Sequence, residues 1–127
     1  MIVLDAAAAV LALLNDGDAR RSAARETVAV PHVVDAELAH ALRAQVRRDR
    51  VSAEQAEAAL IQWARLGLRR FPIVGLLPRM WELRESLSAY DASYVALAES
   101  LGCPLLTADA RLARAPGATC TVTVVRR

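Results

Sequence analysis

Four acidic residues of this chain occupy positions beside or within apolar segments, where a carboxylate suggests a chemical function. Asp5 and Asp109 each follow a short apolar run, and Glu37 and Asp91 each fall within the apolar face of an expected helix. Carboxylates that converge repel one another and raise each other's pKa. Hard oxygen ligands of this kind suit Mg²⁺ or Mn²⁺, which activates water and steadies charge on a phosphoryl oxygen. We therefore predict that the four acids form one divalent-metal site.

Glu37 and Asp91 resist a surface explanation most strongly. With about 100° of turn per residue, Glu37 falls inside an apolar arc that includes Leu38 and Leu42, whereas His40 is assigned to the opposite face. Asp91 falls inside the arc of the later helix in the same way. An inward carboxylate costs several kcal/mol unless it is paired or bound to a metal. For either residue singly, the alternative is a buried salt bridge to an arginine.

Asp5 and Asp109 have a simpler alternative, because aspartate is a favoured residue at the N-cap of a helix. Each follows an apolar run and precedes a helical stretch. Ligands of an open parallel sheet bind beyond the carboxyl ends of its strands. We therefore expect both carboxylates to reach the same place as Glu37 and Asp91.

The elements that must position these acids alternate between strands and helices. We expect strands at 2–4, 28–30, 71–75, 104–107 and 122–125, and helices at 6–14, 18–25, 33–50, 52–66, 78–86, 90–101 and 110–114. Such alternation predicts an α/β domain with a central parallel β-sheet flanked by α-helices on both faces. The sequence shows neither a linker nor a repeat, so residues 1–127 are expected to form a single domain.

Composition limits the class of protein. Hydrophobic residues make up 55% and charged residues 24% of 127 residues, so the chain is expected to fold. The apolar runs are too short to span a bilayer and the start lacks a basic signal region, which favours a cytoplasmic protein. All 16 basic residues are arginine, which is compatible with phosphate contact. Cys103 and Cys120 are expected to be free, buried thiols.

The surroundings of the acids resemble those of PIN-domain ribonucleases, especially the toxin subunits of VapBC-type toxin–antitoxin pairs. The likeness covers the whole chain in order, and its ordered set of motifs is fairly specific. The stretches that carry it are Met1-Ile2-Val3-Leu4-Asp5-Ala6, Val34-Asp35-Ala36-Glu37, Tyr90-Asp91-Ala92-Ser93-Tyr94-Val95-Ala96-Leu97-Ala98 and Leu105-Leu106-Thr107-Ala108-Asp109-Ala110-Arg111-Leu112.

The resemblance implies a PIN-like fold, usually dimeric, in which Asp5, Glu37, Asp91 and Asp109 hold one or two Mg²⁺ or Mn²⁺ ions. It implies endoribonuclease activity, the hydrolysis of RNA phosphodiester bonds by an activated water, with the Thr107 hydroxyl near the site. It also implies a toxin that inhibits translation or growth until a cognate antitoxin blocks its site. The protein is then expected as a homodimer or as a toxin–antitoxin hetero-oligomer.

Two departures from the family pattern affect the expected site. Ala7 stands where many members have Ser or Thr, and arginines stand where some carry a further acid, so binding of one ion is favoured over two. We hypothesise that Arg111 or Arg114 contacts substrate phosphate. A solvated helix face is the alternative for both.

Other functions were compared with this expectation. A phosphate-receiver domain requires a lysine, and the chain has none; an aspartyl-phosphate phosphatase requires an aspartate where Ala7 stands. A P-loop or a Gly-rich dinucleotide turn is also absent from the sequence. The alternative that remains is a non-catalytic PIN-like binding module, whose acids are structural or bind a metal only to steady a partner complex.

Overall fold

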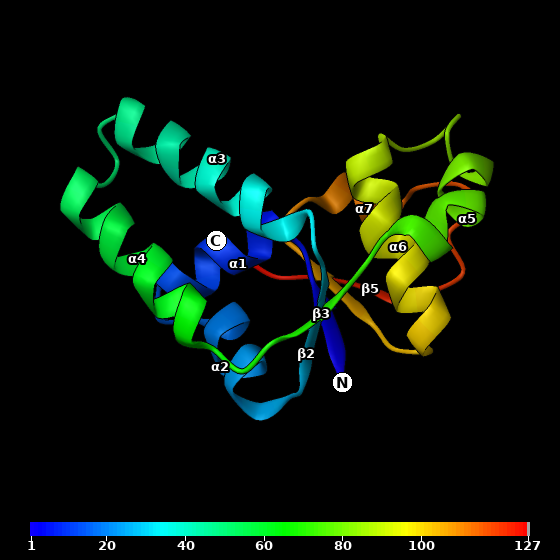
Figure 1. Ribbon diagram of the computed structural model, residues 1–127, viewed down its shortest axis with the longest axis horizontal. Coiled ribbons are helices and arrows are strands. Elements are labelled where there is room, and N and C mark those ends of the chain that lie inside the picture. Colours follow the sequence, from blue (N-terminus) through cyan, green and yellow to red (C-terminus); the bar gives the residue numbers. More distant parts are fainter. Residues whose placement is uncertain (127) are drawn as a thin grey trace.

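The computed structural model describes residues 1–126 and contains one five-stranded parallel sheet (Figure 1). The strand order is β3-β2-β1-β4-β5. The strands are β1 (Ile2–Leu4), β2 (Val28–Pro31), β3 (Arg69–Phe71), β4 (Leu105–Thr107) and β5 (Val122–Val124). In the centre, Val3 pairs with Ala29 of β2 and with Leu105 of β4. Because every pair is parallel, the carboxyl ends of all five strands lie at one edge of the sheet.

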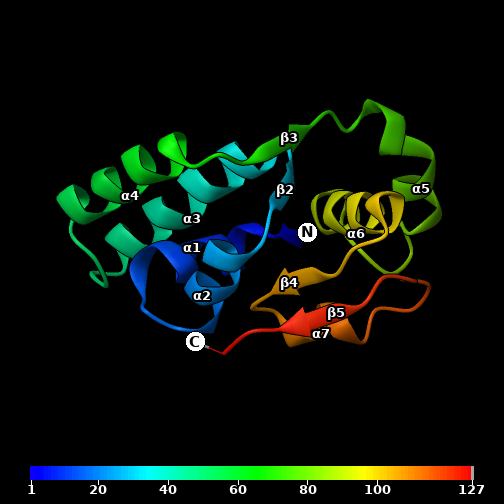
Figure 2. The same ribbon diagram turned by 90° about the horizontal axis from the view of Figure 1, so that it is seen from below.

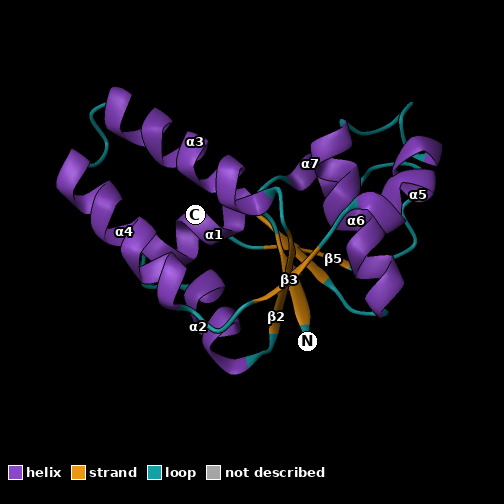
Figure 3. Cartoon of the chain, viewed as in Figure 1, coloured by secondary structure: helices purple, strands orange, loops and turns teal. Residues whose placement is uncertain are grey.

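Helices cover the sheet from both sides (Figure 3). One group contains α1 (Ala6–Leu14), α2 (Asp18–Arg25), α3 (Val34–Arg47) and α4 (Ala53–Arg65). Figure 2 shows α5 (Leu77–Glu82) and α6 (Ala89–Leu101) on the other side. A 3₁₀ turn, η1 (Val74–Leu76), precedes α5, and α7 (Ala110–Ala113) connects β4 to β5. The expected α/β class, with a parallel sheet between helices, is confirmed. No helix among residues 1–126 combines the length and apolar character that crossing a bilayer requires.

The central strands are buried on both faces. Ile2, Val3 and Leu4 of β1 are at most 5% exposed, and Leu105 of β4 is fully buried. A strand between two helical layers has no solvent face, which explains why β1 is a continuous apolar run rather than an alternating one. The buried run from Ala92 to Ala98 places most of α6 inside the same core. The first acid of the chain therefore follows a strand that is rigidly packed.

Three predicted boundaries were wrong. The third strand runs over Arg69–Phe71 rather than 71–75, because Pro72 lacks the amide that would continue the ladder, and the next residues form η1. Helix α3 ends at Arg47 rather than 50, since Asp49 has a left-handed conformation with φ of 56°. The helix predicted at 78–86 spans only Leu77–Glu82. The other predicted elements differ from the structure by a residue or two at most.

A salt bridge does form near Glu37, but it involves Asp35. The Asp35 carboxylate accepts two hydrogen bonds from Arg70, at 2.9 and 3.0 Å, and a third from the Trp63 indole at 2.7 Å. This network joins α3 to β3 and α4. It leaves Glu37 free for another partner.

Candidate active site

Asp5 lies at the carboxyl end of the central strand β1 and is the N-cap of α1. Its side chain accepts a 2.8 Å hydrogen bond from the Ala8 amide and is only 4% exposed. Burial, with a smaller contribution from the charges of Asp91 and Glu37, raises the pKa of Asp5 to about 6. Hydrogen bonds from the Thr107 hydroxyl and the Ala8 amide act in the opposite direction. The residue is thus an N-cap, and it also lies within the field of two other predicted ligands.

Thr107 is the last residue of β4 and is fully buried. Its Oγ1 accepts a 2.9 Å hydrogen bond from the Asp109 amide, and its hydroxyl lowers the pKa of the Asp5 carboxyl. The side chain therefore connects the ends of the two central strands. This position supports the predicted hydroxyl beside the acids.

Glu37 belongs to the first turns of α3 and is half-buried. Its Oε1 accepts a 2.6 Å hydrogen bond from the Tyr94 hydroxyl of α6. Burial raises the pKa of the carboxyl and so does the charge of Asp91, whereas the Tyr94 hydrogen bond lowers it. Among residues 1–126, no arginine forms a salt bridge with Glu37. The sequence did not reveal this role of Tyr94, although a buried phenol hydroxyl generally needs a partner.

Asp91 stands in the first turn of α6, which begins at the N-cap Ser88. The Ser88 Oγ accepts a 3.1 Å hydrogen bond from the Asp91 amide. Burial raises the pKa of the Asp91 carboxyl, and the charge of Asp109 raises it too. A weaker opposing effect comes from Ser88 and Arg111. Asp91 is therefore affected by the charge of Asp109, and its own charge acts on Asp5 and Glu37.

Asp109 is the N-cap of α7, and its side chain is hydrogen-bonded to that helix. Its side chain accepts from the Arg111 amide at 2.9 Å and from the Arg111 guanidinium at 2.8 Å. These bonds hold the pKa of Asp109 below its ordinary value. Arg114 lies one turn further on and is exposed, and its charge also lowers the pKa of Asp109. Asp109 thus faces the other acids electrostatically while its oxygens are paired with Arg111.

The four acids form an electrostatic chain. The charges of Asp91 and Glu37 raise the pKa of Asp5, and the charge of Asp91 also raises that of Glu37. The charge of Asp109 in turn raises the pKa of Asp91. As the side chains stand, no three acidic, histidine or cysteine side chains within residues 1–126 are grouped closely enough to hold a metal ion. The donor set itself, carboxylates with a neighbouring hydroxyl, is the kind that Mg²⁺ and Mn²⁺ prefer. The residue types therefore fit a divalent ion, and the placement of all four around one ion stays a prediction.

A hollow of about 590 Å³ adjoins Glu37 and includes His40. The sequence assigned His40 to the face opposite Glu37, and this assignment was wrong, because residues three apart on a helix are neighbours. The residues that line this hollow are Ala6, Ala7, Val33, Ala36, Glu37, His40, Ala41 and Tyr90. Ala7, where many family members have a hydroxyl, is therefore part of the wall.

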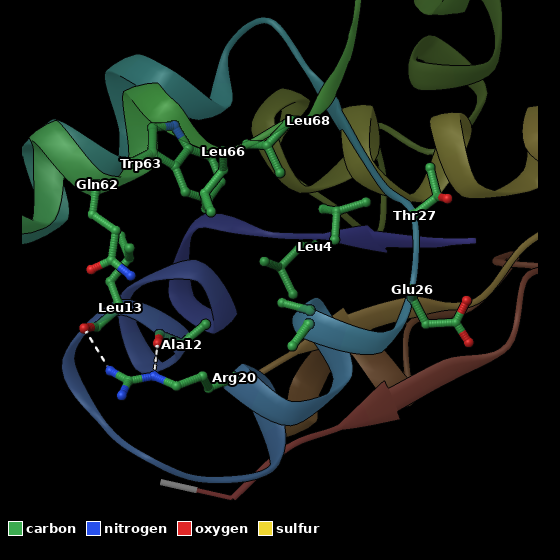
Figure 4. Close-up of a pocket in the computed structure, with 14 residues that line it drawn as sticks. Leu4, Ala12, Leu13, Arg20, Glu26, Thr27, Gln62, Trp63, Leu66 and Leu68 are labelled. Atoms are coloured by element: carbon green, nitrogen blue, oxygen red, sulfur yellow. Dashed lines mark hydrogen bonds between the residues drawn. The ribbon is translucent and has the colours of Figure 1, made fainter.

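A second hollow, of about 400 Å³, lies elsewhere, between α1, α2 and α4 (Figure 4). Leu4, Trp63 and Leu68 point into it, and Arg20 closes one side by donating to the carbonyls of Ala12 and Leu13. None of the four acids lines this hollow. The chemistry expected from the sequence therefore belongs to the other region, at the carboxyl edge of the sheet.

Comparison with known proteins places the chain in a family. The family model described as the PIN domain matches residues 2–118. The chain is 56% identical, over the full length of both proteins, to Ribonuclease VapC9 of Mycobacterium tuberculosis and to VapC ribonuclease Mb0985 of Mycobacterium bovis. It belongs to the VapC ribonucleases of the PIN-domain family.

Solved structures show the same PIN fold. The chain matches VapBC2 from Rickettsia felis, bound to a promoter DNA fragment, with a TM-score of 0.71 and 18% identity, covering 98% of this chain and 99% of that one. It matches VapC20 of Mycobacterium tuberculosis, described as a Sarcin-Ricin loop cleaving toxin, with a TM-score of 0.64 and 22% identity, covering 90% and 94%. These two likenesses concern the fold, which confirms the PIN-like architecture expected from the sequence.

Proposed function

We propose that this VapC ribonuclease is an Mg²⁺- or Mn²⁺-dependent endoribonuclease whose site consists of Asp5, Glu37, Asp91 and Asp109. The observation that carries the proposal is the electrostatic coupling of the acids, since burial and the charge of a neighbouring acid raise the pKa of three of them. A cation neutralises that negative charge. The proposed substrate is RNA, as the ribonuclease names of the relatives indicate, and this suits the predicted cytoplasmic location.

The residues have separate tasks in this proposal. A bound divalent ion supplies an activated water and stabilises charge on the phosphoryl oxygens. Thr107 and the Ala8 amide orient the Asp5 carboxylate, and Tyr94 orients Glu37. Arg111 is 85% exposed on its side chain, so its ion pair with Asp109 is weak in water and the guanidinium is available to a phosphate. Arg114 is a second candidate for phosphate contact.

We also propose that the protein is a toxin that inhibits translation or growth until a cognate antitoxin neutralises it. Support comes from the fold, which is shared with VapBC2 and with a toxin–antitoxin complex from Klebsiella pneumoniae with a TM-score of 0.64. The assembly is then a homodimer or a toxin–antitoxin hetero-oligomer. A short reading frame beside the gene, whose product co-purifies with this chain and stops RNA cleavage, is the expected result. An isolated gene, or a neighbour that leaves cleavage unchanged, contradicts the toxin role.

The nuclease is tested by mapping cleavage of total cellular RNA with purified, antitoxin-free protein. Cleavage is expected with Mg²⁺ or Mn²⁺ and not with EDTA. Asp5→Asn and Asp91→Asn should each remove it, whereas the exposed Asp16→Asn should not, with circular dichroism showing that all three variants fold. Full activity of either site variant removes that residue from the site.

The alternative function is the non-catalytic binding module. Two observations favour it: the four acids are not grouped around one point as they stand, and Ala7 replaces a hydroxyl. This reading predicts that metal changes the melting temperature or the binding of a partner while RNA stays intact with both Mg²⁺ and Mn²⁺. Any cleavage that Asp5→Asn abolishes excludes it.

A further inference from the structure

The hollow beside Glu37 has the size and lining of a binding subsite. Four alanines, at positions 6, 7, 36 and 41, line its wall. Short side chains at the start of α1 and on one side of α3 leave the space between these helices and α6 open. The volume of about 590 Å³ lies within the usual range for small-ligand sites.

Two ring side chains line this hollow. Tyr90 of α6 is 56% exposed, and its hydroxyl has no hydrogen-bond partner among the residues that the structure describes. His40 of α3 is also exposed and its ring is without a hydrogen bond in the same part of the chain. Exposure of an aromatic ring to water is unfavourable, and stacking on a planar partner removes part of that exposure. These rings are therefore available to a planar, partly apolar ligand.

The position of the hollow relates it to the acids. Glu37 belongs both to its lining and to the electrostatic chain, and Tyr90 directly precedes Asp91. A phosphate held at the acids thus places the neighbouring nucleotide over the hollow. Flat ligands of this kind, unstacked RNA bases, are recognised by stacking on tyrosine or histidine and by hydrogen bonds to their edges.

We propose that Tyr90 and His40 form a nucleobase subsite that binds the base next to the scissile phosphate of RNA. The subsite rests on the proposed nuclease function and assigns a specificity role to residues outside the acids. Tyr90 supplies the stacking face, and His40 meets the base edge or its open face. The alanine wall, Ala7 included, provides the room that a longer side chain would occupy.

Direct binding of short RNA oligonucleotides tests this subsite without relying on cleavage. Fluorescein-labelled oligo(A), oligo(C) and oligo(U) are titrated with protein in an Asp5→Asn background containing Mg²⁺, which removes turnover and lowers the charge that repels phosphate. Tyr90→Ala is expected to weaken binding roughly 5- to 100-fold, the range for loss of one base–aromatic stack. Tyr90→Phe should retain binding, and His40→Ala should change the preference among the three oligomers. Trp81→Ala removes a 68% exposed ring on α5, outside the hollow, and is expected to bind as the parent does.

Oligonucleotides with one abasic position locate the contact. Removing the base at one position should weaken binding of the parent protein and have no further effect on Tyr90→Ala. A flat abasic scan, equal binding by Tyr90→Ala and Trp81→Ala, or no RNA binding by the parent overturns the subsite. If this surface binds only a protein partner, Tyr90→Ala and Trp81→Ala should likewise bind RNA equally, and the subsite is contradicted. Tyr90-dependent binding by a chain that never cleaves RNA would retain the subsite and reject the nuclease, so the two failures are distinguishable.

Discussion

The Tyr94 hydroxyl donates a 2.6 Å hydrogen bond to Oε1 of Glu37 and so joins α6 to α3 at the carboxyl edge of the sheet. Tyr94 is 1% exposed, so its ring has one packed position. The Ala6 amide, which directly follows Asp5, lowers the pKa of the same hydroxyl, whereas the charge of Asp5 raises it. A single side chain therefore contacts the surroundings of two of the four acids.

Tyr94→Phe is expected to lower cleavage by about 10- to 100-fold, as outer partners of metal ligands commonly do. The phenyl ring preserves the packing, while Glu37 loses the donor that holds its position. The measurement is the Mg²⁺ dependence of the rate together with its pH profile, which a merely structural residue would leave unchanged. Ser86→Ala, which removes an exposed hydroxyl between α5 and α6, serves as the control. Unchanged Mg²⁺ and pH dependence in Tyr94→Phe would show that the hydrogen bond is only structural.

The pKa of Asp5 makes metal-free stability depend on pH. The folded value is about 6 against an ordinary 3.8, so the folded chain holds this proton more tightly than the unfolded chain does. The free energy of unfolding should therefore fall as pH rises from about 4 to about 6, by about 3 kcal/mol at most. Asp5→Asn keeps an N-cap and should melt higher than the parent at pH 7.5 in EDTA, with the difference vanishing near pH 4. A parent that is the more stable of the two at pH 7.5 without metal contradicts this assignment.

Arg111→Gln tests whether the guanidinium serves substrate or only Asp109. We expect KM for RNA to rise several-fold and the slope of binding against salt concentration to fall by about one, as for a lost phosphate contact. The melting temperature should stay close to that of the parent, since the ion pair is exposed to solvent. Arg21→Gln is the control, because Arg21 pairs with Asp18 on α2 in the same exposed manner. A variant with unchanged KM and tighter Mg²⁺ binding would identify Arg111 as a mask on Asp109.

Glu99 holds the segment before β5 against α6. Its carboxylate accepts bonds from Arg79 at 2.7 and 3.1 Å, from the Thr119 amide at 2.7 Å and from the Thr119 hydroxyl at 2.8 Å. The Arg79 bond, followed by those from Thr119, lowers the pKa of Glu99 to about 2. The stabilisation is complete above the ordinary pKa of 4.5 and is lost as pH falls toward 2.

Glu99→Gln should therefore reduce the free energy of unfolding by about 2 kcal/mol at pH 7, and by much less near pH 2. Urea unfolding at the two pH values measures this difference. Glu82→Gln is the matched control, because its 3.5 Å bridge to the same Arg79 is exposed and should contribute under about 0.5 kcal/mol. Equal losses in the two variants would contradict the assigned role of Glu99.

Local signals in the sequence were sufficient for most of the fold. The Ser52–Gln55 capping box begins α4 within a residue of the predicted start at 52, and Gly102, with φ of 64°, ends α6 after the predicted last residue, 101. These features depend on neighbours along the chain, so pattern alone predicts them. Pro72 was the exception, because the pattern of apolar residues around it suggested a strand that the missing amide prevents.

The sequence by itself determined the class of fold, the family and the placement of acids at strand ends and inward helix faces. Apolar periodicity and ordered motifs are properties of the chain alone. Tertiary structure decided the partners of those acids. Tyr94 bonds to Glu37 although the two are 57 positions apart, and Arg70 pairs with Asp35 rather than with Glu37. Tertiary structure also brought Ala6 and Tyr90 to the hollow beside Glu37 and gave Asp5 its raised pKa. Burial and long-range charge arise only when α1, α3, α6 and β4 come together, and no spacing along the chain contains them.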